Sequence, residues 1–165
     1  MVVLMLLAAD ILVYPLFYLS SYIRRNRDTY TDLLLAVSEE NAWREWFQFF
    51  LEGIREQADE TFSRANLLLD LREQYRDRYG DTRPSVRELL DALFEEPVFT
   101  VSRAADLIDR SNPATNDAVN FLVDEGIIRE TTGKERYREF QADEILKLLN
   151  RSPDELPAPG EIISE

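Results

Sequence analysis

Polar residues suited to reading a nucleic acid gather between Phe99 and Phe140. Four of them recur at helical spacing, and three basic residues follow later in the segment. They are Asn112, Thr115, Asn116, Asn120, Lys134, Arg136 and Arg138. An asparagine amide can bond the edge of adenine in the major groove, and basic side chains bond phosphate oxygens. The set predicts contact with double-stranded DNA, provided that the fold brings its members to one face.

A helix that begins near Asn112 would carry the four polar residues. Asn112 followed by Pro113 is a typical helix start, because the amide can cap the first turn and proline has a preset φ. Gly126 should end this helix, since glycine readily turns left-handed. The inward stripe of the helix is apolar and consists of Ala114, Ala118, Phe121 and Leu122. The asparagines are then left on the outward face.

A shorter helix and a β-hairpin should flank this one. Ser102 can cap the first helix, whose buried side would hold Ala105, Leu107 and Ile108. After Gly126, Ile127–Ile128 begins a strand, residues 131–135 make a turn, and alternation over 136–140 predicts the returning strand. Two helices followed by a hairpin is the order of a winged helix-turn-helix, with the second helix for recognition and the hairpin turn as the wing.

The charge of this segment leaves two functions open. Between Phe99 and Phe140 there are six basic and eight acidic residues, and Pro113 to Glu125 contains three acids and no base. Phosphate contacts supply most non-specific DNA affinity, so an acidic module starts at a disadvantage. DNA binding is the first interpretation, because basic residues are concentrated in the wing. The alternative is a protein-interaction or dimerisation module that has the shape without the charge.

The composition of the whole chain excludes several classes of chemistry. The formal net charge is −13, and of the 19 basic residues only Lys134 and Lys147 are lysines. There is no cysteine and no histidine, so disulfides, thiolate chemistry and the usual general base are absent. An acidic, lysine-poor chain resembles proteins of salt-loving microbes; the plainer interpretation is an acidic cytoplasmic protein kept soluble by charge.

Paired carboxylates offer no convincing catalytic site. Neighbouring residues on a helix point about 100° apart, so adjacent acids do not converge on one substrate atom. We therefore expect no catalytic, cofactor-binding or metal-binding residue. The pairs concerned are Glu39-Glu40, Asp59-Glu60 and Glu95-Glu96.

The strongest helical pattern follows Asn41, which we expect to be its N-cap. The pattern continues for 30 or more residues toward Tyr75, which indicates one very long helix or two helices with a joint. At this spacing the aromatic residues are more typical of a core than of a base-stacking platform. The leading apolar positions are Trp43, Trp46, Phe47, Phe50, Leu51 and Ile54.

The predicted fold is mainly α, a helical bundle followed by a C-terminal winged helix-turn-helix with a small β-hairpin wing. Tyr79 to Pro84 is rich in turn residues and is the best boundary. We expect a helical core over residues 1–80, a linking helix over 81–97, the winged helix over 98–150 and a disordered acidic tail over 151–165.

The first part of the chain resembles the Fic-domain proteins. The similarity covers the second half of a Fic core and runs into the C-terminal winged helix that many members carry. It rests on Ile11-Leu12, Pro15 to Ser20, Arg24, Asn26, Arg27, Asp28, Tyr30, Leu33-Leu34, Val37, Trp43, Trp46-Phe47, Phe50-Leu51, Gly53-Ile54 and Gln57-Ala58.

The resemblance implies a relation to enzymes that transfer AMP from ATP to a protein hydroxyl. Their active-site loop reads H-P-F-x-x-G-N-G-R and leads into the apolar helix that Met1–Leu12 resembles, so the loop would precede Met1. No histidine and no other phosphate-binding glycine motif occurs in the chain. We expect the fragment to be non-catalytic as it stands and to need no cofactor.

The apolar start of the chain predicts an interface. Met1–Leu12 has no basic residue for a signal peptide, and Asp10 and Pro15 interrupt it before a membrane span is reached. A helix that is apolar on most sides would leave large side chains in water, and such patches mark interfaces on soluble proteins. We therefore expect a cytoplasmic homodimer that packs through residues 1–23 and makes no membrane contact.

Overall fold

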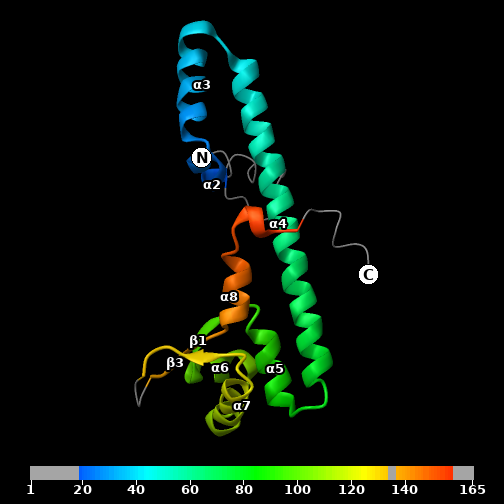
Figure 1. The fold of residues 1–165 in the computed structure, drawn as a ribbon. Helices are drawn as coiled ribbons and strands as arrows, with labels where there is room; N and C mark the ends of the chain where they lie inside the picture. Colours follow the sequence, from blue (N-terminus) through cyan, green and yellow to red (C-terminus); the bar gives the residue numbers. More distant parts are fainter. Residues whose placement is uncertain (1–18, 134–136, 158–165) are drawn as a thin grey trace. The chain divides into compact units, whose positions relative to one another are not determined.

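The computed structural model describes residues 19–133 and 137–157, which are mainly helical with one small antiparallel sheet (Figure 1). This confirms the predicted fold class. The chain forms two compact units that divide between Ser63 and Arg64. The division falls inside helix α4 (Trp43–Tyr79), which contributes to both units. The domain limits expected from the sequence stay predictions.

The first unit contains α2 (Leu19–Arg25), α3 (Arg27–Glu40) and the first part of α4. Its buried hydrophobic cluster consists of Leu19, Tyr22 and Phe50. We expected Asn41 to be the N-cap of α4, and this prediction is wrong. It has φ 60° and ends α3 in the left-handed conformation, with its backbone N–H donating to the carbonyl of Ala36. Asparagine tolerates this conformation, so the residue stops one helix where the pattern predicted that it starts the next.

Helix α4 is continuous for 37 residues, which decides between the two options left open by its apolar pattern. Gly53 lies inside this helix at a point where α2 passes so close that there is no room for a side chain. A Cβ at this position would come within 2.6 Å of Cε1 of the Tyr22 ring. Glycine therefore permits this close approach, although its helical propensity is low.

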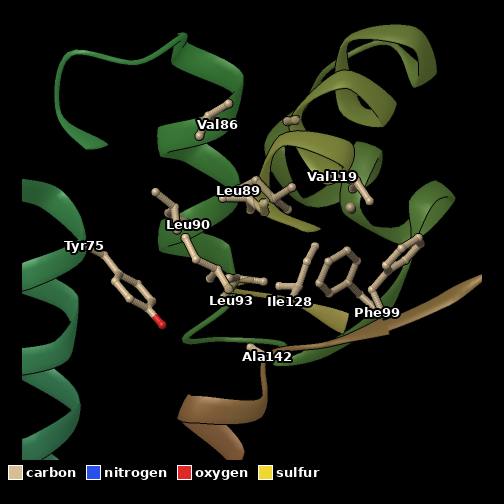
Figure 2. Packing of buried hydrophobic residues seen from close by; sticks show 14 of the residues in the cluster. Tyr75, Val86, Leu89, Leu90, Leu93, Phe99, Val119, Ile128 and Ala142 are labelled. Atoms are coloured by element: carbon tan, nitrogen blue, oxygen red, sulfur yellow. The ribbon is translucent and has the colours of Figure 1, made fainter. Parts of the chain in front are cut away.

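The second unit runs from Arg64 to Leu156 and holds the larger core. Helices α5 (Pro84–Ala92), α6 (Val101–Ile108) and α7 (Asn112–Asp124) pack together, and α8 (Asp143–Leu149) follows the sheet. Figure 2 shows Leu89 of α5 and Leu93 just after it beside Ile128, with Val119 of α7 and Phe99 lining the same core. All of these side chains are buried; those from α5 and α7 belong to the apolar stripe that each helix turns inward.

The sheet has the strand order β1-β3-β2 and is antiparallel. Its strands are β1 (Val98–Thr100), β2 (Arg129–Glu130) and β3 (Glu139–Gln141). Phe99 pairs with Phe140 across β1 and β3, and their stacked rings have centroids 6.0 Å apart. The element order α5-β1-α6-α7-β2-β3 is that of a winged helix-turn-helix. Strand β1 was not expected from the sequence, because its three residues are too few to show alternation.

The ends of several elements differ from expectation. Thr100, not Ser102, caps α6, and the N-cap of α7 is Ser111, not Asn112 as we expected. Gly126 has φ 72°, as expected of a helix-stopping glycine. Within the tail expected to be disordered, Pro153–Glu155 forms a 3-10 turn closed by a capping box between Ser152 and Glu155.

The predicted N-terminal helix over Met1–Leu12 lies outside the described residues. Among helices in the described parts of the chain, none combines the length and apolar character needed to cross a bilayer.

Candidate nucleic-acid interface

The outward face of α7 carries three asparagines at four-residue spacing. Asn112 and Asn120 are exposed, whereas Asn116 is half-buried. The Asn116 amide nitrogen donates to the carbonyl of Asn112 at 3.0 Å, and its oxygen accepts from Nη2 of Arg138 at 3.4 Å. The structure thus brings two predicted site residues from separate elements together.

Thr115 does not belong to this face, and the prediction that it contacts DNA is wrong. Its side chain is fully buried, and its hydroxyl donates to the carbonyl of Ser111 at 3.0 Å. The reason is helical geometry: Thr115 shares the inward stripe of Ala118, Val119 and Leu122. Asn116, one position later, is rotated toward the surface.

Of the three predicted wing residues, Lys134 and Arg136 lie outside the described residues. Arg138 leads into β3, with its guanidinium 5.2 Å from the centre of the Phe140 ring. Its Nη1 is 3.8 Å from Oε2 of Glu130, a long ion pair. With the long hydrogen bond to Asn116, these are the contacts of the guanidinium among the described residues, and the ion pair at this distance is weak.

A cleft of about 240 Å³ opens where α7, β3 and the start of α6 meet. It is lined by Thr100, Val101, Ser102, Asn116, Tyr137 and Arg138. Thr100 Oγ1 accepts a hydrogen bond from the backbone N–H of Arg103 at 3.3 Å. Because Thr100, Val101 and Ser102 line the cleft, the N-terminal end of α6 lies at it, and the partial positive charge of a helix N-terminus suits a phosphate oxygen.

Tyr137 stands at the edge of this cleft and is 89% exposed. Its φ is 55°, a left-handed conformation that costs energy for a bulky residue. Strain of this kind persists where the surrounding structure requires it and is concentrated at functional positions. From the sequence, Tyr137 was expected only as a strand residue. The signal that could have identified it as a site residue was its position as an aromatic next to the basic wing.

Three other arginines of the winged helix are held by carboxylates. Two-point ion pairs join Arg103 to Glu96, Arg110 to Glu88 and Arg129 to Asp143, with the shorter contact of each pair between 2.6 and 2.8 Å. The hydrogen bonds from these arginines lower the pKa of each carboxyl below its ordinary value. Their charge is largely neutralised within the fold, so they add little attraction for phosphate.

From Asp117 onward, α7 is acidic. Asn120 lines a second cleft together with Asp117 and Asp124 of α7, and Asp81 faces it from the loop before α5. Arg83 approaches Asp117 at 3.9 Å, which offsets only part of this charge. A DNA backbone would be repelled here, so the first half of α7 and the wing form the more favourable face.

The described residues hold no cluster of three or more histidine, cysteine, aspartate or glutamate side chains that could bind a metal ion. No protein-family model matches this sequence.

Proposed function

We propose that this chain is a non-catalytic regulatory module whose winged helix binds double-stranded DNA. One observation carries the proposal: Asn116 of α7, Arg138 beside the wing and the first turn of α6 converge on a single cleft. These three parts supply an amide, a cation and a helix N-terminus, which are the usual partners of DNA.

In this arrangement the roles divide by position. Asn112 and Asn116 would read base edges from the first turns of α7, while Arg138 and the start of α6 hold the backbone on either side. Tyr137 adds an exposed aromatic surface next to the phosphate site. Because Arg103, Arg110 and Arg129 are paired with carboxylates, we expect the phosphate contacts to come from Lys134, Arg136 and Arg138.

A matched pair of variants tests the proposed face. Arg138→Ala removes a cation from the cleft, and Arg83→Ala removes the same charge from the acidic end of α7. We expect Arg138→Ala to weaken DNA binding by about tenfold and Arg83→Ala to have little effect. Replacing Lys134, Arg136 and Arg138 together should also make the binding constant less sensitive to salt. The slope of its logarithm against the logarithm of the salt concentration should become shallower by about one unit for each phosphate that these residues bind. Equal losses for the two single variants would assign binding to overall charge and remove the cleft from the proposal.

The pairing of Arg103, Arg110 and Arg129 with carboxylates favours a second function, because it leaves less positive charge for DNA. If folded protein binds no DNA at low salt, the winged helix would be a protein-interaction or dimerisation module. The two-point ion pairs would then stabilise its shape, and the exposed Tyr137 would be a contact residue for a protein.

We also propose that the chain is the C-terminal part of a cytoplasmic Fic-like protein, as its resemblance implies. The chain has no histidine, so we expect no transfer of label from ATP to acceptor proteins. Transfer by a clean preparation would contradict this.

A homodimer remains part of the proposal, with a revised surface. Of the segment 1–23, Leu19 and Tyr22 are buried against Phe50 of their own unit and are not available to a partner. Large exposed apolar side chains lie instead at Trp43, Phe47 and Leu51 of α4, four residues apart on one side of the helix. This stripe supports an interface in the first unit.

A further inference from the structure

A pocket of about 460 Å³ lies between the last turns of α4 and helix α5, within the second unit. None of its lining residues belongs to the proposed DNA-binding face. Its volume lies within the range of about 300–1,000 Å³ typical of small-molecule sites.

The inner wall of the pocket is apolar and aromatic. Tyr75 of α4 faces Leu90 of α5, as Figure 2 shows, and the rings of Tyr75 and Phe94 meet edge to face at 6.0 Å. The Tyr75 hydroxyl donates to Oε2 of Glu144 at 2.9 Å. Burial, with the hydrogen bond to Glu144, raises the pKa of Tyr75 well above its usual value, so this wall carries no charge of its own at neutral pH. A flat apolar group can lie against it.

The rim of the pocket is cationic. Asp91 Oδ1 accepts from Nε of Arg72 at 2.8 Å and from Nη2 of Arg76 at 2.9 Å. One carboxylate therefore holds two guanidinium groups, and one positive charge stays uncompensated. Burial acts to raise the pKa of Asp91, but the bonds and charges of the two arginines outweigh it, so Asp91 remains ionised.

Arg87 adds a second positive charge, which is compensated only in part. Its Nη1 donates to the carbonyl of Gly80 at 3.2 Å, and among the described residues no carboxylate lies within ion-pair distance of it. The neighbouring Glu88 is bound at two points by Arg110, so it offsets the charge of Arg87 only in part. The rim is thus locally positive in a chain whose net charge is −13.

We propose that this pocket binds a small organic anion that consists of a flat apolar ring and one acidic group. The ring would lie against Tyr75, Leu90 and Phe94, and the acidic group would accept hydrogen bonds from Arg76 and Arg87. A cationic ligand would meet the excess of guanidinium charge, and a ligand without a ring would leave the apolar wall in water. The site does not depend on DNA binding.

The probe is naphthalene-2-carboxylate, with the uncharged naphthalene-2-carboxamide as its matched control. The ¹⁵N-labelled full chain is titrated with each compound and followed by NMR. We expect saturable shifts of the backbone amides of Arg87, Leu90 and Phe94 at about 1 mM carboxylate, and binding of the carboxamide at least about tenfold weaker.

Variants then test the rim. Arg87→Gln and Arg76→Gln should each weaken carboxylate binding by about tenfold, whereas Arg83→Gln, which changes a nearby arginine that does not line the pocket, should leave it nearly unchanged. Circular dichroism checks that each variant is folded. If Arg76→Gln unfolds, Arg87→Gln decides, because among the described residues the Arg87 side chain bonds a single backbone carbonyl, that of Gly80. Equal affinity for the carboxylate and the carboxamide, unchanged affinity in Arg87→Gln, or no shift at these amides would overturn the proposal.

Discussion

Phe140 is the residue on which the winged-helix core most depends. It is only 1% exposed and stacks on Phe99 across the sheet. Phe140→Ala should lower the free energy of unfolding by about 3–5 kcal/mol, because it removes buried apolar surface and leaves a cavity. Urea unfolding monitored by circular dichroism measures this change.

Tyr137→Ala is the matched control for Phe140→Ala. It removes an aromatic ring three residues away that is already in water. Its effect should stay within about 0.5 kcal/mol. A loss of similar size in both variants would mean that Phe140 is not a core residue.

At single positions the sequence predicted the side of a helix better than the exact register. The stripe Ala118, Phe121 and Leu122 correctly indicated the inward side of α7. Thr115 was misplaced because a threonine looks polar in a sequence, whereas its hydroxyl can be satisfied by the carbonyl four residues earlier. Asn41 was misplaced because asparagine favours both helix starts and left-handed helix ends.

At the scale of elements, ion pairs connect neighbouring parts of the second unit. Glu88 of α5 binds Arg110 after α6, Glu96 before β1 binds Arg103 of α6, and Asp143 of α8 binds Arg129 of β2. These carboxyls have lowered pKa values in the folded state. A lowered pKa gives stability that is present above the unfolded pKa of about 4 and is lost as pH falls through the folded value.

We therefore predict that the melting temperature stays nearly level from about pH 6 to 9 and falls below about pH 4.5. The level region follows because the chain has no histidine or cysteine to titrate there. This fall in melting temperature at acid pH should be small at high salt, since the ion pairs are exposed and salt screens them. Arg110→Gln removes the partner of Glu88, so the melting temperature of this variant should fall less steeply with decreasing pH. An unchanged steepness would show that Glu88 contributes nothing to the fall. Differential scanning calorimetry over the pH series measures both.

Long elements were more predictable than short ones. The long apolar pattern from Trp43 indicated α4, and the asparagine, proline and glycine signals indicated α7 and its end. The three-residue strand β1 could not be found this way, because its place depends on pairing with β3, which follows only after α6, α7 and β2. The cleft beside Arg138 likewise depends on three elements that only the fold brings together.

At the scale of the whole molecule, the apolar stripe of the first unit predicts self-association. Burying Trp43, Phe47 and Leu51 against a second copy would contribute about 1.5–3 kcal/mol each. High salt should favour the contact by screening the repulsion between two chains of charge −13. Light scattering over a dilution series should show a dimer at high salt, and Phe47→Asp should shift it toward monomer. Monomer at every concentration would contradict the proposed interface.

DNA binding is the central claim, and fluorescence anisotropy with a labelled duplex tests it most directly. The full chain is titrated from about 0.1 M to about 1 M KCl, over which the Debye length falls from about 10 Å to about 3 Å. Circular dichroism at each salt concentration confirms that the protein is folded. With three phosphate contacts from Lys134, Arg136 and Arg138, we predict measurable binding whose logarithm falls with log salt at a slope of about −3. Folded protein that causes no anisotropy change at the lowest salt would contradict the claim.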